Sequence, residues 1–163
     1  MRHNISDIQK IFHTTFGDKY KTRLEFGADE PFYQAAHDNS KDNIIYCRED
    51  FFASSLHEIA HWCLAGVERR QKDDYGFWYS PDGRDIEKQL LFEKVEVKPQ
   101  AIEKAFSVAC GYTFKASVDN LHLVDHDPSD FITNINAQYE RYLKASFPKR
   151  ASEFIQALKE FYS

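Results

Sequence analysis

Cysteine is scarce in this chain: its 163 residues include only three, Cys47, Cys63 and Cys110. Their number is odd, their spacing is wide and no CxxC pair occurs, so neither a disulfide framework nor a thiolate zinc cluster is expected. Free thiols of this kind fit a reducing compartment. The sequence therefore predicts a cytoplasmic protein.

Long apolar runs are also missing. No run reaches the roughly 20 apolar residues that a membrane span needs, and residues 1–16 lack the apolar core of a signal peptide. The net charge of −5 argues against nucleic acid, which would favour a basic face. We expect neither membrane nor nucleic acid as a partner, whereas a cationic substrate suits the acidic balance. A monomer is the simplest expectation for the oligomeric state, which no pattern in the sequence specifies.

The composition is typical of one globular domain. Hydrophobic residues make up 42% of the chain and aromatic residues 15%, which excludes a disordered protein. A chain of this length buries enough apolar surface to fold without disulfides or structural metals. The order of periodic segments is a helix, a few short strands and then mostly helices. This order predicts a single α+β domain over residues 1–163, rich in helix and with a small sheet.

In the first half of the chain, apolar spacing predicts a helix over residues 5–16. Two short runs on either side of residues 27–31 predict a hairpin, and residues 43–48 are typical of a third strand. The next helix should begin at a cap formed by Asp50 and end near Gly66. Its expected apolar stripe is Leu56, Ala60, Cys63 and Val67.

In the second half, residues 73–85 and 119–130 are dense in turn-forming or acidic residues and are expected to be loops. Residues 86–110 are predicted to be helical, with Pro99 either beginning a helix or kinking a longer one. Two more helices are expected, one around residues 131–142 and a last one around residues 154–161.

One short motif carries chemistry. His57 and His61, in SSLHEIAHWC, are four residues apart, so a helix places both imidazoles on one face, where they can chelate a single ion. With Glu58 they form an HExxH motif. The alternative is that the three side chains only make ordinary hydrogen bonds, but the spacing favours a metal. Trp62, within the same segment, is expected to pack in the core.

Two histidines need a further ligand. The HExxHxxGxxH pattern fails, because Leu64 and Val67 stand where it requires Gly and His. Downstream, Glu93 and Glu96 are the candidates, and they share one helical face. One of them could bind the metal while the other orients a histidine. The same face continues through Gln100 and Glu103.

The other histidines are weaker candidates. A second cluster contains His122, Asp125, His126 and Asp127. Pro128 and the density of charge there favour a loop, so no metal role is assigned to it. The remaining histidines are expected at the surface: His3, His13 and His37.

Two histidines and one carboxylate do not decide the chemistry. With Zn²⁺ they make a hydrolytic site in which Glu58 is the general base. With Fe²⁺ they leave positions open for oxygen and substrate, as in non-haem oxygenases. A third reading is a binding module in which the metal is structural. HExxH alone would favour the hydrolase.

Long local matches favour the oxygenase over the hydrolase, because the sequence resembles the elongation factor P hydroxylase family. The resemblance runs through most of the chain and is much more specific than HExxH. It is densest in RLEFGADEP, FFASSLHEIAHWCLAG, GFWYSPDGRD, FEKVEVKPQA, ACGY and the segment Asp119-Asn120-Leu121.

The resemblance implies a monooxygenase that uses O₂ to hydroxylate a lysine of translation elongation factor P, after that lysine has received a β-lysyl group. It implies a zincin-like helix and the metal ligands His57, His61 and Glu96. Fe²⁺ is the expected metal, although Zn²⁺ or another divalent ion can occupy such a site in a purified sample. Glu93 is then expected to orient a ligand, and Glu58 to handle protons.

The loop between the two ligand segments is expected to contact the substrate. Asp82 or Asp85 could meet an ammonium group. The alternative is that SPDGRD is only a turn with a structural Arg84. The aromatic residues that could wall the methylene stem of a long lysine are Tyr75, Phe77, Trp78 and Tyr79.

Overall fold

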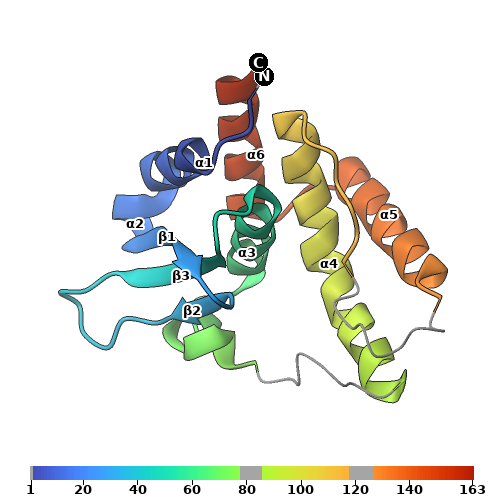
Figure 1. Cartoon of the computed structure of the whole chain (residues 1–163), viewed down its shortest axis with the longest axis horizontal. Helices are drawn as coiled ribbons and strands as arrows, with labels where there is room; N and C mark the ends of the chain where they lie inside the picture. The colour runs from blue at the N-terminus through green and yellow to red at the C-terminus, as the bar shows by residue number, and fades with distance from the viewer. Residues whose placement is uncertain (1, 78–85, 118–126) are drawn as a thin grey trace.

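A computed structural model describes residues 2–77, 86–117 and 127–163, and its fold is α+β and rich in helix, as predicted (Figure 1). The strands are β1 (Thr22–Ala28), β2 (Phe32–Gln34) and β3 (Asn43–Arg48). The helices are α1 (Ile5–Phe12), α2 (Asp18–Tyr20), α3 (Phe52–Leu64), α4 (Ile86–Cys110), α5 (Ser129–Lys144) and α6 (Lys149–Tyr162). Three short turns complete the list: the π-helical η1 (His13–Gly17) and the 3-10 helices η2 (Arg69–Gln71) and η3 (Asp73–Gly76).

The three strands form one sheet in the order β1-β3-β2. β3 pairs in parallel with β1 and antiparallel with β2, so the predicted hairpin between the first two strands is wrong. The reason lies in β3, which buries Ile44, Ile45 and Cys47 and so takes the central place between two edge strands. Gly27, at φ 93°, lies where the register of β1 shifts.

Helix α3 begins without the predicted cap. Phe51 occupies the N-cap position and offers no side-chain hydrogen bond, so the assignment of this role to Asp50 is wrong. Instead, the backbone N–H of Arg48 donates to Oγ of Ser54 over 3.1 Å, which ties the end of β3 to the first turn of α3. The strand and the metal-motif helix are thus joined directly.

The same helix ends at Leu64, earlier than predicted. Val67 lies beyond it and is 67% exposed, so its assignment to the apolar stripe is wrong. The other three members of the stripe are buried, and so is Trp62, as predicted: Leu56, Ala60, Cys63 and Trp62.

Trp62 fixes the back of α3 in the core. Its ring lies 5.1 Å from that of Phe12 and 5.0 Å from that of Phe16, centroid to centroid, and Tyr20 contacts it edge-on at 5.3 Å. Phe154 of α6 stacks on Phe16, with ring centroids 6.0 Å apart. Because this face of α3 is buried against α1, η1 and α2, the opposite face is left to α4.

Helix α4 is continuous from residue 86 to residue 110 and runs through Pro99, which therefore does not begin a helix. It lies beside α3, and α5 packs on it through Ala101, Phe131 and Ile135 (Figure 1). One face of α4 is both buried and polar, which is uncommon, because buried polar groups need partners. Its members recur at helical spacing: Gln89, Glu93, Glu96, Gln100, Glu103 and Ser107.

The remaining expectations are met in part. Helices α5 and α6 cover the two predicted C-terminal helices, and α5 begins at Ser129, inside the range expected to be a loop. His37 is exposed as predicted, but His3 and His13 are half-buried and hydrogen-bonded, to the carbonyl of Cys110 and the backbone N–H of Leu24. Within the described residues, no helix is both long and apolar enough to cross a membrane.

Candidate metal centre

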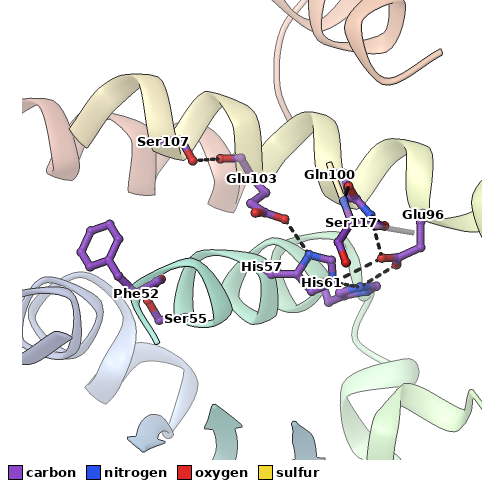
Figure 2. Close-up of polar contacts among 9 residues, drawn as sticks. All are labelled: Phe52, Ser55, His57, His61, Glu96, Gln100, Glu103, Ser107 and Ser117. Carbon is purple, nitrogen blue, oxygen red and sulfur yellow. Dashed lines mark hydrogen bonds and ion pairs between the residues drawn. The ribbon is translucent and has the colours of Figure 1, made fainter. Parts of the chain in front are cut away.

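The HExxH histidines and one glutamate of α4 converge. His57 and His61 lie on one face of α3, and their Nε2 atoms are 3.2 Å apart (Figure 2). Glu96, only 3% exposed, places Oε1 3.3 Å from Nε2 of His57 and Oε2 2.8 Å from Nε2 of His61. Donor atoms of the three residues all lie within 4.8 Å of one another. The three residues assigned as metal ligands from the sequence are therefore brought together.

The geometry follows from the way the two helices pack. His61, late in α3, contacts Glu96, early in α4, whereas His57 also contacts Glu103, two turns further along α4 (Figure 2). The helices therefore run in opposite directions, with the histidine face of one against the buried polar face of the other. His57 and His61 are four residues apart on α3, and the glutamates that they contact, Glu103 and Glu96, are seven residues apart on α4. Each histidine therefore contacts a carboxylate.

Glu103 fixes the orientation of His57. Its Oε1 lies 2.6 Å from Nδ1 of that histidine, and the glutamate is 7% exposed. When Nδ1–H donates to this carboxylate, the lone pair of the neutral ring is on Nε2, which faces the centre. The sequence placed Glu103 on the right helical face but did not assign it this contact.

Gln100 holds the other side of the centre. Its Nε2 donates to Oε1 of Glu96 over 3.3 Å and to the backbone carbonyl of Ser117 over 2.8 Å. The N–H of Ser117 donates back to Oε1 of Gln100 over 3.0 Å. This fully buried amide therefore joins the carboxylate of Glu96 to the segment that follows α4.

The residues present fit a cation. Oε2 of Glu96 is buried and makes no hydrogen bond with the described residues, although it lies 2.8 Å from Nε2 of His61. One ligand atom from each of the three residues lies within 4.8 Å of the others, so a single ion could contact all three. Two nitrogens and one carboxylate are a ligand set for Zn²⁺ or for Fe²⁺.

Without a metal, the pKa shifts of His57 and Glu96 favour a proton shared among these side chains. Burial acts to lower the pKa of His57, but Glu96 and Glu103 together raise it well above its ordinary value of 6.5. Burial acts to raise the pKa of Glu96, but His61 and His57 hold it well below its ordinary 4.5. The site thus stabilises positive charge between its side chains. Metal binding would release the proton.

Glu58, the middle residue of the motif, is half-buried on α3. Burial raises the pKa of its carboxyl above the ordinary 4.5, while His57 and His61 act to lower it. Such a carboxyl holds a proton more readily than an exposed glutamate, beside the histidine pair. This suits proton transfer and does not by itself distinguish a hydrolase from an oxygenase.

The other residues singled out from the sequence are more dispersed. Glu93 is buried and accepts a hydrogen bond from Gln89 over 2.9 Å, and its predicted role in orienting a ligand stays a prediction. Asp127, from the second acidic cluster, accepts hydrogen bonds from Ser129 at the start of α5. The following residues lie outside the described part of the chain: Trp78, Tyr79, Asp82, Arg84, Asp85, His122, Asp125 and His126.

The two aromatic residues at the start of the predicted substrate loop are described. Tyr75 is 6% exposed and stacks on Tyr33, with ring centroids 4.3 Å apart. Phe77 is 40% exposed and lies 4.2 Å from the guanidinium of Arg69. Their contact with a substrate remains a prediction.

The fold is helix-rich α+β, and a buried carboxylate lies against the HExxH helix. These features are typical of metal-dependent enzymes, which makes this chain a candidate for that class. The sequence profile of the elongation factor P hydroxylase family matches residues 11–163. A protein of Haemophilus influenzae named elongation factor P lysine hydroxylase is 47% identical over 163 residues, which are 100% of this chain and 92% of that protein. The chain therefore belongs to the elongation factor P hydroxylase family, and the resemblance found in its sequence is confirmed.

Proposed function

We propose that this protein hydroxylates the β-lysylated lysine of translation elongation factor P, using O₂ and an Fe²⁺ ion held by His57, His61 and Glu96. The observation that carries the proposal is the convergence of two imidazole nitrogens with a buried carboxylate oxygen that has no hydrogen bond of its own among the described residues. Family membership supports the reaction and the protein substrate.

The ligand set suits oxygen chemistry. Bound Fe²⁺ would supply O₂ activation, because two histidines and one carboxylate leave positions for both oxygen and substrate. The electron balance of the reaction also shows that an external reductant is needed. O₂ takes up four electrons, of which the C–H bond of the lysine supplies two. The other two, with two protons, must come from an external reductant, so that one oxygen atom enters the hydroxyl group and the other leaves as water.

The residues of the chain have separate tasks in this proposal. Glu103 keeps the Nε2 lone pair of His57 directed at the centre, and Gln100 holds the carboxylate of Glu96. Glu58, whose pKa is raised by burial, carries a proton to or from the reacting groups. Asp82 and Asp85 are proposed to attract the ammonium groups of the substrate.

A zinc peptidase is the second candidate. It is favoured by HExxH itself, in which Glu58 would take a proton from metal-bound water. A structural metal in a binding module is the third. The name of the relative agrees with the hydroxylase and not with either alternative.

Product mass and metal content separate the three. The protein loaded with Fe²⁺ should add one oxygen atom to lysylated elongation factor P in the presence of O₂ and a reductant, without cleaving the backbone. Unlysylated elongation factor P, the Zn²⁺-loaded protein and the His61→Ala variant serve as controls. Peptide fragments from the Zn²⁺-loaded sample, or an unchanged substrate with a fully Fe²⁺-loaded protein, would contradict the proposal.

A further inference from the structure

A cavity of about 420 Å³ adjoins the candidate metal centre. It lies between the first turn of α3, the second half of α4 and the segment that follows α4. The residues that matter for its chemistry are Ala53, Glu103, Ser107, Tyr112, Phe114 and Lys115. Its volume is within the usual range of small-molecule sites, about 300–1,000 Å³.

The cavity continues the groove between the two helices. Ala53 lies one helical turn before His57 on the same face of α3, and Ser107 lies one turn after Glu103 on α4. Glu103 therefore lies at the boundary between the two sites. One of its carboxylate oxygens contacts His57 (Figure 2), and its side chain also lines the cavity. A ligand in the cavity and a group at the metal centre would share this glutamate.

The charged residues that line the cavity favour a cationic ligand. Glu103 is 7% exposed, so its negative charge acts at short range with little screening by solvent. Lys115 is the other charged residue of the lining, and it is exposed, so water and salt weaken its field. The rings of Tyr112 and Phe114 offer faces that pack methylene groups and attract cations. The third ring, that of His3, is engaged with the carbonyl of Cys110.

We propose that this cavity binds the amino-bearing end of the lysyl group on the substrate lysine, with Glu103 accepting the ammonium. This inference rests on the proposed function. It gives a binding site to the β-lysyl group, which distinguishes the substrate from an ordinary lysine. Ala53 of the cavity wall and His57 of the metal centre are four residues apart on one face of α3, which is about 6 Å along the helix axis. An extended chain of five or six bonds spans about the same distance, roughly two residues' worth of backbone. A lysine carbon at the metal centre thus leaves the added amino group near Glu103.

Filling the cavity at a position away from the metal tests the proposal. Ala53→Leu adds a branched side chain at an exposed helical site and leaves the ligands and Glu103 unchanged. Thr113→Leu, in the part of the lining that follows α4, is the second variant. Ser152→Leu, exposed in the first turn of α6, is the matched control. Unfolding and metal affinity are measured for all of them, so that a folding defect is recognised.

Two peptides with the sequence around the modified lysine of elongation factor P serve as probes. One carries the β-lysyl extension, and the other carries a neutral acyl chain of equal length without amino groups. We expect the metal-loaded protein to bind the first at least about tenfold more tightly by calorimetry, a range typical for loss of fit or of a buried polar contact. Both cavity variants should lose most of this preference and raise KM for lysylated elongation factor P more than they change kcat.

The two proposals fail in different ways. If the wild-type protein hydroxylates its substrate while Ala53→Leu and Thr113→Leu keep KM and the preference for the lysyl peptide, the cavity is not the site, although the function stands. If the wild-type protein binds the lysyl peptide, the variants lose that binding and no hydroxylation occurs, the cavity assignment stands and the function does not. Equal binding of the two peptides by the wild-type protein would also overturn the cavity proposal.

Discussion

At the scale of single residues, Glu103 determines what His57 can offer a metal. An imidazole has two nitrogens, and the one that donates a hydrogen bond cannot bind a metal. The 2.6 Å contact between Glu103 and Nδ1 leaves Nε2 for the centre. Carboxylates that orient histidine ligands in this way typically contribute about 10–100-fold in metal affinity.

We therefore predict that Glu103→Ala weakens Fe²⁺ or Zn²⁺ binding about 10–100-fold, whereas Glu103→Gln, which keeps an acceptor oxygen, weakens it less. Competition with a metal-binding dye measures the affinities. The Nδ1 proton of His57 should be visible by NMR in the wild-type protein and in Glu103→Gln but exchange-broadened in Glu103→Ala. Unchanged affinity in Glu103→Ala would remove the glutamate from the metal centre.

The ligands themselves should behave differently. His57→Ala, His61→Ala and Glu96→Ala are each predicted to abolish stoichiometric metal binding and to leave the far-UV circular dichroism largely unchanged, because these side chains contribute ligation more than packing. Glu93→Ala is the comparison and is expected to retain the metal with reduced affinity. Loss of the metal from Glu93→Ala together with its retention in Glu96→Ala would reverse the assignment.

Part of this site could be predicted from the sequence. The spacing of His57 and His61 defines a shared helical face, which is a local property. Spacing could not choose between the two candidates, Glu93 and Glu96, because both lie on one face of α4. The choice depends on the axial offset between α3 and α4, which is set by packing, and only the family resemblance singled out Glu96.

At the scale of elements, the end of α3 is held by arginines. Arg150 of α6 donates to the carbonyls of Trp62 and Ala65, and Arg70 also donates to Ala65. The guanidinium of Arg150 lies 4.6 Å from the ring centroid of Trp62. Positive groups at a helix C-terminus satisfy its free carbonyls and complement its dipole. They hold the turn that carries His61.

Arg150→Ala is expected to lower the free energy of unfolding by about 2 kcal/mol, because it removes charge-assisted hydrogen bonds to carbonyls that are partly buried. Lys149→Ala, one residue earlier and exposed, is the control and should change stability little. Urea denaturation measures both. Equal stability of the two variants would mean that α3 does not depend on this contact.

The predicted elements show which signals are local. Apolar periodicity located the main helices, because each buries a face of its own. The hairpin prediction failed because β1 finds its partner in β3, which lies beyond β2 in the sequence, and local turn chemistry carries no information about such a pairing. The cap assigned to Asp50 failed for a similar reason, since the start of α3 is fixed by its link to β3.

The aromatic segment that the sequence predicts to be a substrate-contacting loop gives a prediction of a different kind. Trp78→Ala or Tyr79→Ala should raise KM for lysylated elongation factor P while metal affinity stays close to that of the wild-type protein, because these residues are predicted to contact the substrate rather than the ion. Parallel titrations of metal and substrate measure both quantities. Equal losses in the two would mean that the loop is structural.

At the scale of the whole molecule, α3 is held between two different environments. Its aromatic back packs on α1, η1 and α2, and its histidine face meets the buried polar stripe of α4. In proteins generally, replacing buried ion pairs by apolar residues of similar size is often neutral or stabilising. Six polar residues are buried along one face of α4, and two of them contact the histidines of α3, which indicates that this face serves a function rather than stability alone.

The source of the product's oxygen tests the central claim most directly. The Fe²⁺-loaded protein is incubated with lysylated elongation factor P and a reductant, once with isotopically labelled O₂ in ordinary water and once with ordinary O₂ in labelled water. The account predicts one labelled atom on the modified lysine in the first experiment only, and residual activity in Glu58→Gln. Cleaved peptides that carry label from water, formed without O₂ and lost in Glu58→Gln, would contradict it and identify a peptidase.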